Sequence, residues 1–394
     1  MPGTATANSA PTTVLQGIEV PTTSIDPAQF FARTRRLSYL VKTSAFAGLG
    51  STDNIPIQQA GIISGLRVRF VGSLVTTPGT GTAATSARWP YDLVRGFRFS
   101  ANGQSNLINA SGWKLKAREF MARGDLNDRG VVQRIGAGNV QQGTLSLASE
   151  TWGVGQNQSG LTGATTPIEL EWYLPIAFDD VSLVGAIFAQ TSATDLQLSI
   201  DWANASDIFV VTGNATMVLS GSYVVESKTY TIPQAPNGSV IVPDLSTFHS
   251  ITQSRFTGPG NGDNEVRLAG QGVGKQLMRL WWQLWNGAAP GAPVPVNATN
   301  FGNLAWRFGG NDTPEVMRDG SSMNHEMERT FGVDMGTLAG FAGFDFASEN
   351  AFRDSVDEAT ATELRFLMNI ANGVSLTNPS IEYVQETLSN GASV

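Results

Sequence analysis

Short runs of hydrophobic and polar residues alternate along most of this chain, with the two-residue period of β-strands. Leu66, Val68 and Phe70 form an apolar face, and Arg67 and Arg69 between them form a basic one. Glycine, proline, asparagine or aspartate bounds most of these runs, as expected where strands end in tight turns. The pattern predicts strands at residues 37–46, 62–75, 93–99, 168–176, 196–202, 217–232, 273–285, 304–308, 364–370 and 381–388.

Helical signals interrupt the strands at three places. Asp26 stands at an N-cap position, and Pro27 follows it at the first position of a short predicted helix. This helix is expected to carry an aromatic and basic set: Phe30, Phe31, Arg33, Arg35, Arg36 and Leu37. Apolar side chains at helical spacing predict two more helices, one with Trp113, Ala117, Phe120 and Met121 and one with Met323, Met327 and Phe331.

Ten or more strands joined by long Gly/Pro/Asn-rich loops indicate an all-β sandwich architecture. The chain has 394 residues, and a single sandwich rarely exceeds about 250. Residues 1–24 are rich in Thr, Ser, Ala and Pro with almost no charge, which is typical of a flexible arm. We therefore predict an arm and short helix at 1–37 and two tandem sandwiches at 38–238 and 239–394.

Charge is scarce and unevenly distributed. Charged residues make up 15% of the chain, compared with about 25% in ordinary globular proteins. The net charge of -8 argues against a whole-protein clamp on nucleic acid. Residues 1–134 hold 15 basic and 7 acidic residues, whereas residues 135–394 hold 10 and 26. This asymmetry predicts two chemically different faces.

Several classes of chemistry are excluded or disfavoured. The chain has no cysteine and only two histidines, His249 and His325, which excludes disulfide scaffolds, thiolate nucleophiles and Cys/His zinc sites. Neither histidine accompanies a nucleophile-elbow motif, so we interpret both as structural. The glycine run at 270–274 precedes a strand instead of opening a helix, which indicates a turn and no dinucleotide site. We expect no catalytic residue and no cofactor.

One polar cluster could offer oxygen ligands to a hard cation: Asn261, Asp263, Asn264 and Glu265. Its spacing is not that of an EF-hand, and residues of these types are the normal material of turns. We therefore predict no metal, although a cation near Asp263 remains open.

Large aromatic side chains occupy both faces of the strand predicted at 273–285. A carbohydrate platform needs exposed tryptophans on one face only, whereas a strand between a core and a neighbouring subunit carries them on both. We therefore predict that Trp281, Trp282 and Trp285 lie in the core or at a subunit interface. A carbohydrate-binding or receptor-binding sandwich remains the alternative.

A second set of side chains is basic. It joins Arg33, Arg35 and Arg36 with Arg67, Arg69, Lys114, Lys116 and Arg118. The set lacks the interleaved exposed aromatics that stack on bases, so we expect no sequence-specific nucleic-acid binding. A solvated face explains it most simply, while contact with an anionic membrane or an acidic neighbour stays open.

Neither end of the chain carries a recognisable targeting or membrane-spanning signal. The first residues lack a basic region followed by an apolar one, so we expect no signal peptide and synthesis in the cytoplasm. No apolar run approaches the 18 or so residues that a spanning helix needs.

Four segments resemble, in order, segments of one family, the double jelly-roll major capsid proteins of tectivirus-like phages. They read GIISGLRVRFVGSL, YDLVRGFRFSANGQSNLINASGWKLKAREF, IELEWYLPIAFDDVSLVGAIFAQTSATDLQLSIDWAN and IVPDLSTFHSI. The third is the most specific, with its Tyr-x-Pro pattern and the turn that follows. The resemblance covers about the first 255 residues well and the remainder loosely.

The resemblance implies two tandem jelly rolls and a structural protein without catalysis. It implies pseudo-hexagonal homotrimers that tile an icosahedral virion shell around an internal lipid membrane. The expected partners are sister subunits, neighbouring trimers, penton and other minor capsid proteins, and that membrane. The N-terminal segment of the family faces the membrane, so Phe30, Phe31, Arg33, Arg35 and Arg36 are expected to do so. Relatives can carry a longer, Gln-rich N-terminal helix, and a minor vertex protein of the same fold is a further alternative.

Overall fold

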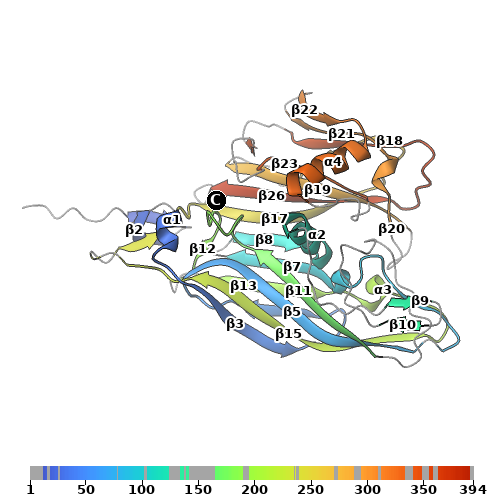
Figure 1. The fold of residues 1–394 in the computed structure, drawn as a ribbon, viewed down its shortest axis with the longest axis horizontal. Helices are drawn as coiled ribbons and strands as arrows, with labels where there is room; N and C mark the ends of the chain where they lie inside the picture. The colour runs from blue at the N-terminus through green and yellow to red at the C-terminus, as the bar shows by residue number, and fades with distance from the viewer. Residues whose placement is uncertain are drawn as a thin grey trace, which may run out of the picture.

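Strands dominate the computed structural model, and all of its helices are short (Figure 1). It describes residues 12–390, apart from 16–17, 25–26, 78, 102–103, 124–133, 137–138, 142–164, 190–194, 235, 237–238, 270–273, 288–293, 309–311, 333–339, 348–354 and 358–362. Every strand predicted from the two-residue period is present, within a few residues of its expected bounds.

Two β-sandwiches lie one above the other in Figure 1. The first sandwich has an outer sheet in the antiparallel order β11-β5-β15-β3. Its strands are β3 (Arg36–Ala45), β5 (Ile62–Thr77), β11 (Thr165–Pro175) and β15 (Thr216–Tyr230), and β12 (Ile187–Phe188) adds to β5. Leu66, Val68 and Phe70 are fully buried, while Arg67 and Arg69 point away from the core. The alternation therefore gives this sheet one inner and one outer face, as predicted.

A single ten-stranded sheet supplies the other layer of the first sandwich and one layer of the second. Its main path runs β20-β19-β26-β17-β8-β7-β13-β4. The members are β4 (Thr52–Pro56), β7 (Val94–Ala101), β8 (Gln104–Ala110), β13 (Leu196–Trp202), β17 (Thr247–Thr257), β19 (Lys275–Asn286), β20 (Val294–Pro295), β23 (Phe341–Asp345), β24 (Val356–Asp357) and β26 (Ser380–Asn390). The two sandwiches meet where β8 and β17 pair in parallel, through Ile251 with Ile108 and Thr252 with Asn109.

The second sandwich is closed by a four-stranded sheet in the order β18-β25-β21-β22. These strands are β18 (Gly262–Arg267), β21 (Phe301–Phe308), β22 (Asp312–Met317) and β25 (Arg365–Ile370). Helix α4 (Gly320–Phe331) packs beside them and buries Met323 and Met327, as its spacing predicted. The Asp319 side chain accepts a hydrogen bond from the Ser322 amide at 2.8 Å and caps the helix.

Short elements complete the fold. They are β1 (Thr12–Leu15), β2 (Ile18–Ser24), β6 (Ala83–Thr85), β9 (Arg134–Gly136), β10 (Asn139–Gln141), β14 (Phe209–Val211), β16 (Val240–Val242), α1 (Pro27–Phe31), α2 (Gly112–Arg123), α3 (Ala205–Ile208) and the 3-10 turns Tyr91–Leu93 and Ala298–Asn300. Helix α2 contains Trp113, Ala117, Phe120 and Met121, whose spacing predicted a helix here.

The N-terminal region differs from its prediction in two respects. Residues 12–15 and 18–24, which we assigned to a flexible arm, form β1 and β2, and β2 pairs in parallel with β16. Their β-branched residues suit a strand once a partner strand is available. Helix α1 begins at Pro27 as predicted but ends at Phe31, so Leu37 lies in β3 and not in a helix. Residues 1–11 of the predicted arm lie outside the described residues.

Candidate functional site: the charged junction between the sandwiches

Helix α2 begins where the two sandwiches meet, and its first residues explain why it lies there. Ser111 caps the helix by accepting a hydrogen bond from the Lys114 amide, while its own amide donates to Gln253 Oε1 on β17 at 2.8 Å. A Cβ on Gly112 would lie 2.5 Å from the Tyr91 carbonyl oxygen, so only glycine permits this approach. Trp113 donates from its indole to Gln283 Oε1 on β19 at 2.9 Å. The Ser-Gly-Trp start therefore ties one sandwich to the other.

The tryptophans of β19 are buried on both faces of the strand, as their pattern required. Trp282 points into the second sandwich, where it stacks on Phe366 at 4.5 Å between ring centroids. Trp281 and Trp285 are equally buried on the opposite face, and Trp285 meets Trp113 of α2 edge to face at 5.8 Å. The chain itself thus covers both faces of β19, without a neighbouring subunit.

The first charged cluster of the junction is centred on Glu382, near the start of β26. Arg88 Nη2 lies 2.9 Å from one carboxylate oxygen and Lys114 Nζ lies 3.7 Å from the other. Burial raises the pKa of Glu382, but the charges of Arg88 and Lys114 outweigh burial and hold that pKa below its ordinary value. Burial also lowers the pKa of Lys114 to about 7, although Glu382 opposes the shift.

The second charged cluster, here called the junction network, surrounds Glu386, which is fully buried four residues further along β26. Arg118 of α2 donates from Nε to Glu386 at 2.6 Å, and Arg279 Nη1 lies 3.5 Å away. Arg279 also pairs with Asp345 at 3.0 Å. Burial alone would raise the pKa of Glu386, but the neighbouring positive charges and the contact with His249 bring it well below its usual range.

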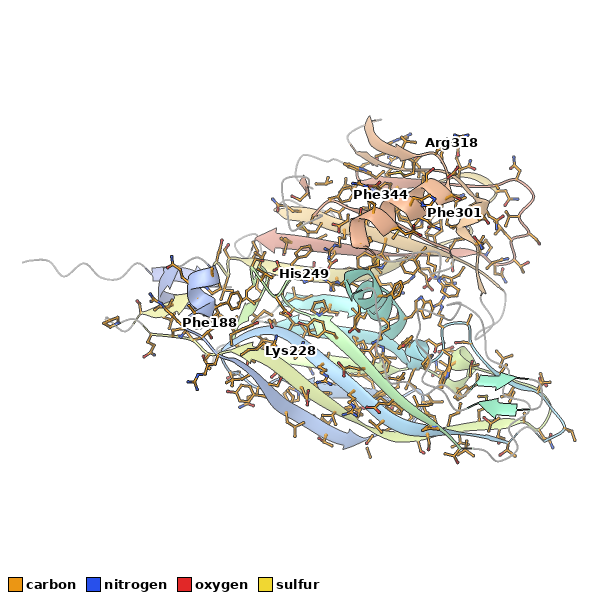
Figure 2. The ribbon with its side chains drawn as sticks, viewed as in Figure 1. Phe188, Lys228, His249, Phe301, Arg318 and Phe344 are labelled. Carbon is orange, nitrogen blue, oxygen red and sulfur yellow. The ribbon has the colours of Figure 1, made fainter. Side chains whose placement is uncertain are left out.

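His249 completes the junction network from β17, and Figure 2 labels it between the two sandwiches. Its Nε2 lies 3.0 Å from Glu386 and its Nδ1 lies 3.3 Å from the Ile176 carbonyl oxygen. Both partners are acceptors, so a neutral imidazole satisfies one of them and an imidazolium satisfies both. His325, in contrast, is largely exposed on α4. These placements give both histidines structural surroundings.

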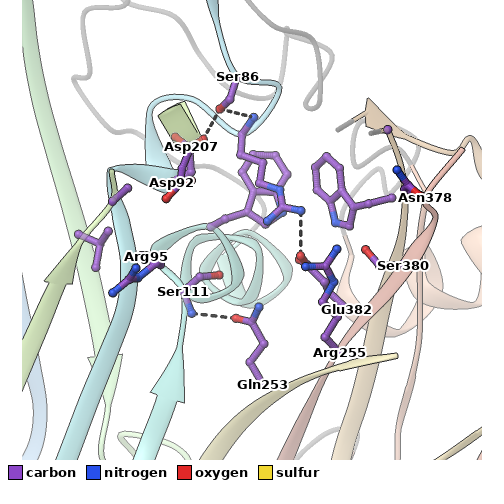
Figure 3. A pocket seen from close by; sticks show the side chains of 16 residues that line it. Ser86, Asp92, Arg95, Ser111, Asp207, Gln253, Arg255, Asn378, Ser380 and Glu382 are labelled. Atoms are coloured by element: carbon purple, nitrogen blue, oxygen red, sulfur yellow. Dashed lines mark hydrogen bonds and ion pairs between the residues drawn. The ribbon is translucent and has the colours of Figure 1, made fainter. Parts of the chain in front are cut away.

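A cavity of about 570 Å³ opens beside the first cluster, between the two sandwiches (Figure 3). The first sandwich contributes Ser86, Arg88, Asp92, Val94, Arg95, Ser111, Trp113, Ala203 and Asp207, and the second contributes Gln253, Arg255, Trp285, Gly287, Asn378, Ser380 and Glu382. Asp92 accepts a hydrogen bond from the Ser86 hydroxyl. Burial nevertheless raises the pKa of Asp92 to about 7.

Most of the basic set predicted from the sequence is neutralised inside the chain. On the outer sheet, Arg67 pairs with Glu171 at 2.6 Å and with Glu226 at 3.4 Å, and Arg69 pairs with Glu169; these five residues are here called the outer network. Lys114, Lys116 and Arg118 of α2 are buried instead of solvated. Lys116 pairs with Glu119 of the same helix, but the acidic partners of the other four basic residues come from later parts of the same chain. For these residues, the uneven charge along the sequence reflects internal pairing and not two different surfaces.

The residues predicted to face a membrane are split between core and surface. Phe30 is fully buried and meets Tyr230 edge to face at 6.3 Å, so its ring belongs to a small core under α1. Phe31 is half-buried against the same tyrosine. Arg33, Arg35 and Arg36 are exposed in the segment that follows, beside α1.

The polar cluster around Asp263 forms protein contacts. Asp263 accepts a hydrogen bond from Asn369 at 2.6 Å, Glu265 pairs with Arg365 at 2.9 Å, and Asn264 closes the turn at Gly260. Within the described ranges, no group of three or more acidic or histidine side chains could hold a metal ion. The same ranges contain no helix that is both long and apolar enough to cross a membrane.

Sequence reasoning missed the acidic half of the junction. Glu382 and Glu386 lie in a run we interpreted only as a strand, and Arg88 lies in a connection with no strong pattern. The available signal was the spacing of the two glutamates, which places both on one face of a strand together with Val384. Charged side chains in the middle of an otherwise apolar strand are buried only when they are paired.

Comparisons with known proteins agree with this architecture. A family model described as "P3 major capsid protein N-terminal" matches residues 28–237, which is more than half of the chain. The crystal structure of the major capsid protein of Sulfolobus turreted icosahedral virus aligns with a TM-score of 0.63 at 15% identity, over 90% of this chain and 97% of that one. The quasi-atomic model of the PBCV-1 virus capsid gives 0.54 at 12%, over 91% and 95%. No curated protein sequence matches. The predicted double jelly-roll fold is confirmed.

Proposed function

Because the chain belongs to the P3 family of phage major capsid proteins, we propose that it builds its shell as a pseudo-hexagonal homotrimer in an icosahedral lattice around an internal membrane. The family membership makes it a structural component of the virion. The trimer, the icosahedral lattice and the internal membrane are the features that we propose in addition to this family membership.

The parallel pairing of β8 with β17 is the observation that carries this proposal. It fuses the two sandwiches into one ten-stranded sheet, and α2 packs across the seam. Each subunit is therefore one body with two similar lobes. Three such subunits around a threefold axis present alternating lobes and a nearly hexagonal outline, which tiles a closed lattice.

Light scattering after size-exclusion chromatography tests the trimer. We expect a mass three times that of the 41.9 kDa chain. A monomeric mass that persists up to the solubility limit would contradict the proposal. Electron micrographs of the native particle test the lattice, and the proteins that copurify with it would identify the vertex and minor capsid proteins that we propose as further partners.

We also propose the predicted domain limits, with an N-terminal element at 1–37 and jelly rolls at 38–238 and 239–394. All five strands of the outer sheet precede residue 231, and every strand of the second sandwich follows residue 246. Limited proteolysis should therefore cut between these two positions before it cuts either sandwich. Earlier cleavage within β5 or β19 would argue against these limits.

The exposed arginines beside α1 support the proposed contact with lipid. Arg33, Arg35 and Arg36 follow α1 closely along the chain, and α1 lies at one end of the molecule (Figure 1). Each arginine near an anionic surface contributes about 1 kcal/mol of attraction. Replacing all three with alanine should therefore weaken binding to vesicles that contain anionic lipid by about 100-fold.

Flotation of the purified protein with such vesicles measures this effect. The matched control replaces three exposed arginines of the second sandwich, Arg267, Arg318 and Arg329, and should float like the unmodified protein. Equal losses in both triple variants would show that net charge, and not this segment, determines binding. Unchanged flotation of the Arg33/Arg35/Arg36 variant would overturn the membrane contact.

The competing carbohydrate-binding function lacks its main requirement in the described part of the chain. Every tryptophan described there is buried or half-buried, including Trp281, Trp282 and Trp285. A sugar ring therefore has no exposed indole face there on which to stack.

A further inference from the structure

We infer that the cavity between the two sandwiches is a binding site for a small, multiply charged oxyanion of the phosphate class. The inference goes beyond the proposed shell function, since a subunit could assemble without such a ligand. It rests on which side chains line the cavity and on how they are paired.

Cationic side chains approach the cavity from both sandwiches. Arg95 comes from β7 of the first sandwich and Arg255 from β17 of the second (Figure 3). Both are exposed, and neither forms an ion pair with a described carboxylate, although Arg255 lies opposite Glu382 of β26 and its charge helps to lower the pKa of Glu382. Most other arginines of the junction already form an ion pair with a carboxylate. Arg95 and Arg255 are therefore available to a ligand.

Arg88 gives the cavity a fixed third guanidinium. Its Cζ lies 4.0 Å from the centre of the Trp285 ring, and its Nη2 is held by Glu382 at 2.9 Å. The Nε–H of Arg88 and the indole N–H of Trp285 have no acceptor among the described residues. Guanidinium groups match the oxygens of phosphate in a planar, two-pronged geometry. Arg88 therefore adds a positively charged guanidinium to the wall of the cavity.

The acidic side chains of the wall are mostly engaged or only partly charged. Glu382 is countered by Arg88 and Lys114, and Asp207 accepts hydrogen bonds from Asn204 at the start of α3. Because burial raises the pKa of Asp92 to about 7, that carboxyl is partly protonated at neutral pH. The three arginines of the wall thus face three carboxyl groups, and the partial protonation of Asp92 leaves a small excess of positive charge.

The dimensions and position of the cavity agree with a soluble ligand. Its volume of about 570 Å³ lies within the range of roughly 300–1,000 Å³ typical of ligand pockets. Arg255 lies on β17 and Arg95 on β7, so a bound anion bridges the two sandwiches. Figure 1 places α3 and the neighbouring cavity elements away from α1, the segment that we assign to lipid. A free anion is thus favoured over a lipid headgroup.

Calorimetric titration of the purified, assembled protein with inorganic phosphate and with pyrophosphate tests the site, at neutral pH and in sodium chloride of matched ionic strength. We expect saturable binding and a higher melting temperature than chloride alone gives. Arg95→Gln or Arg255→Gln should each weaken binding by about 10-fold, and the double variant by about 100-fold. Arg318→Gln, which removes an exposed arginine far from the cavity (Figure 2), is the matched control and should bind like the unmodified protein.

Three results would overturn the inference. The first is that phosphate and chloride change the melting temperature of the unmodified protein equally. The second is that the double variant binds phosphate as tightly as the unmodified protein. The third is a double variant that loses flotation with anionic vesicles but keeps phosphate binding, which would assign these arginines to lipid. Because both arginines are exposed, the variants should keep the native mass and the ligand-free melting temperature, so a loss of binding is not a loss of folding.

Discussion

The outer network and the junction network contain nearly identical ion pairs in very different surroundings. Arg67 lies 2.6 Å from Glu171 in the outer network, and Arg118 lies 2.6 Å from Glu386 in the junction network. The outer pair is 38% and 31% exposed, whereas the junction pair is 9% and 0% exposed. Water screens the outer pair, but it cannot compensate either partner of the junction pair if the other is lost. The burial of an ion pair, and not its contact distance, therefore decides how much the loss of one partner destabilises the fold.

Neutralising Glu386 should have the largest effect. Glu386→Gln leaves Arg118 without a carboxylate partner in a buried site and leaves Arg279 with Asp345 alone, so we expect a loss of about 3–5 kcal/mol in the free energy of unfolding. Denaturant unfolding monitored by tryptophan fluorescence measures it, since several tryptophans surround the junction. Glu171→Gln in the outer network is the matched control and should cost under about 1 kcal/mol. Similar losses in both variants would refute the distinction between the networks.

The second prediction concerns Lys114 of the junction, whose titration should make the stability of the protein depend on pH. Burial lowers its pKa from 10.5 to about 7 in the folded protein, so between these values the unfolded chain holds the proton and the folded chain does not. Stability from this group therefore rises with pH from about 7 towards 10.5. Lys114→Met should remove that rise, which melting temperatures between pH 7 and 9 would show.

The control for this pH effect is Lys228→Met, because Lys228 lies on the outer sheet with its ammonium 4.2 Å from the centre of the Tyr173 ring. We expect this variant to keep the pH slope of the unmodified protein. If Lys114→Met also keeps that slope, then Lys114 stays charged in the folded state and the junction is wetter than its burial indicates.

The same contrast shows how far the sequence could predict this molecule. The period of two in Leu66 to Phe70 is a local property, so it predicted β5 and the side of the sheet that faces water. The spacing in α2 also predicted a helix, but its lysines and Arg118 were interpreted as solvated because charged residues usually are. The burial of Arg118 depends on Glu386, which lies 268 residues away. No local pattern identifies a partner at that distance.

The tryptophans of β19 illustrate the same limit from the apolar side. Their pattern predicted cover on both faces of the strand, but it could not identify the residue that supplies the second cover. Trp113 of α2 provides it, at a separation of 172 residues from Trp285. The local sequence thus indicates that these tryptophans need a packing partner, but only the three-dimensional fold determines which residue that partner is.

The smallest effect is expected at Arg69, the most exposed member of the outer network, whose side chain is 47% exposed beside Glu169. Arg69→Gln should change the free energy of unfolding by less than about 1 kcal/mol, because water already solvates both partners. The change should also shrink as salt is raised from 0.05 to about 0.5 M, since the ionic atmosphere screens exposed charges. Melting temperatures of the two proteins at both salt concentrations measure this. A loss that is large, or that persists at high salt, would mean that another surface covers this sheet face in the assembled protein, and Arg69 would then behave like the junction arginines.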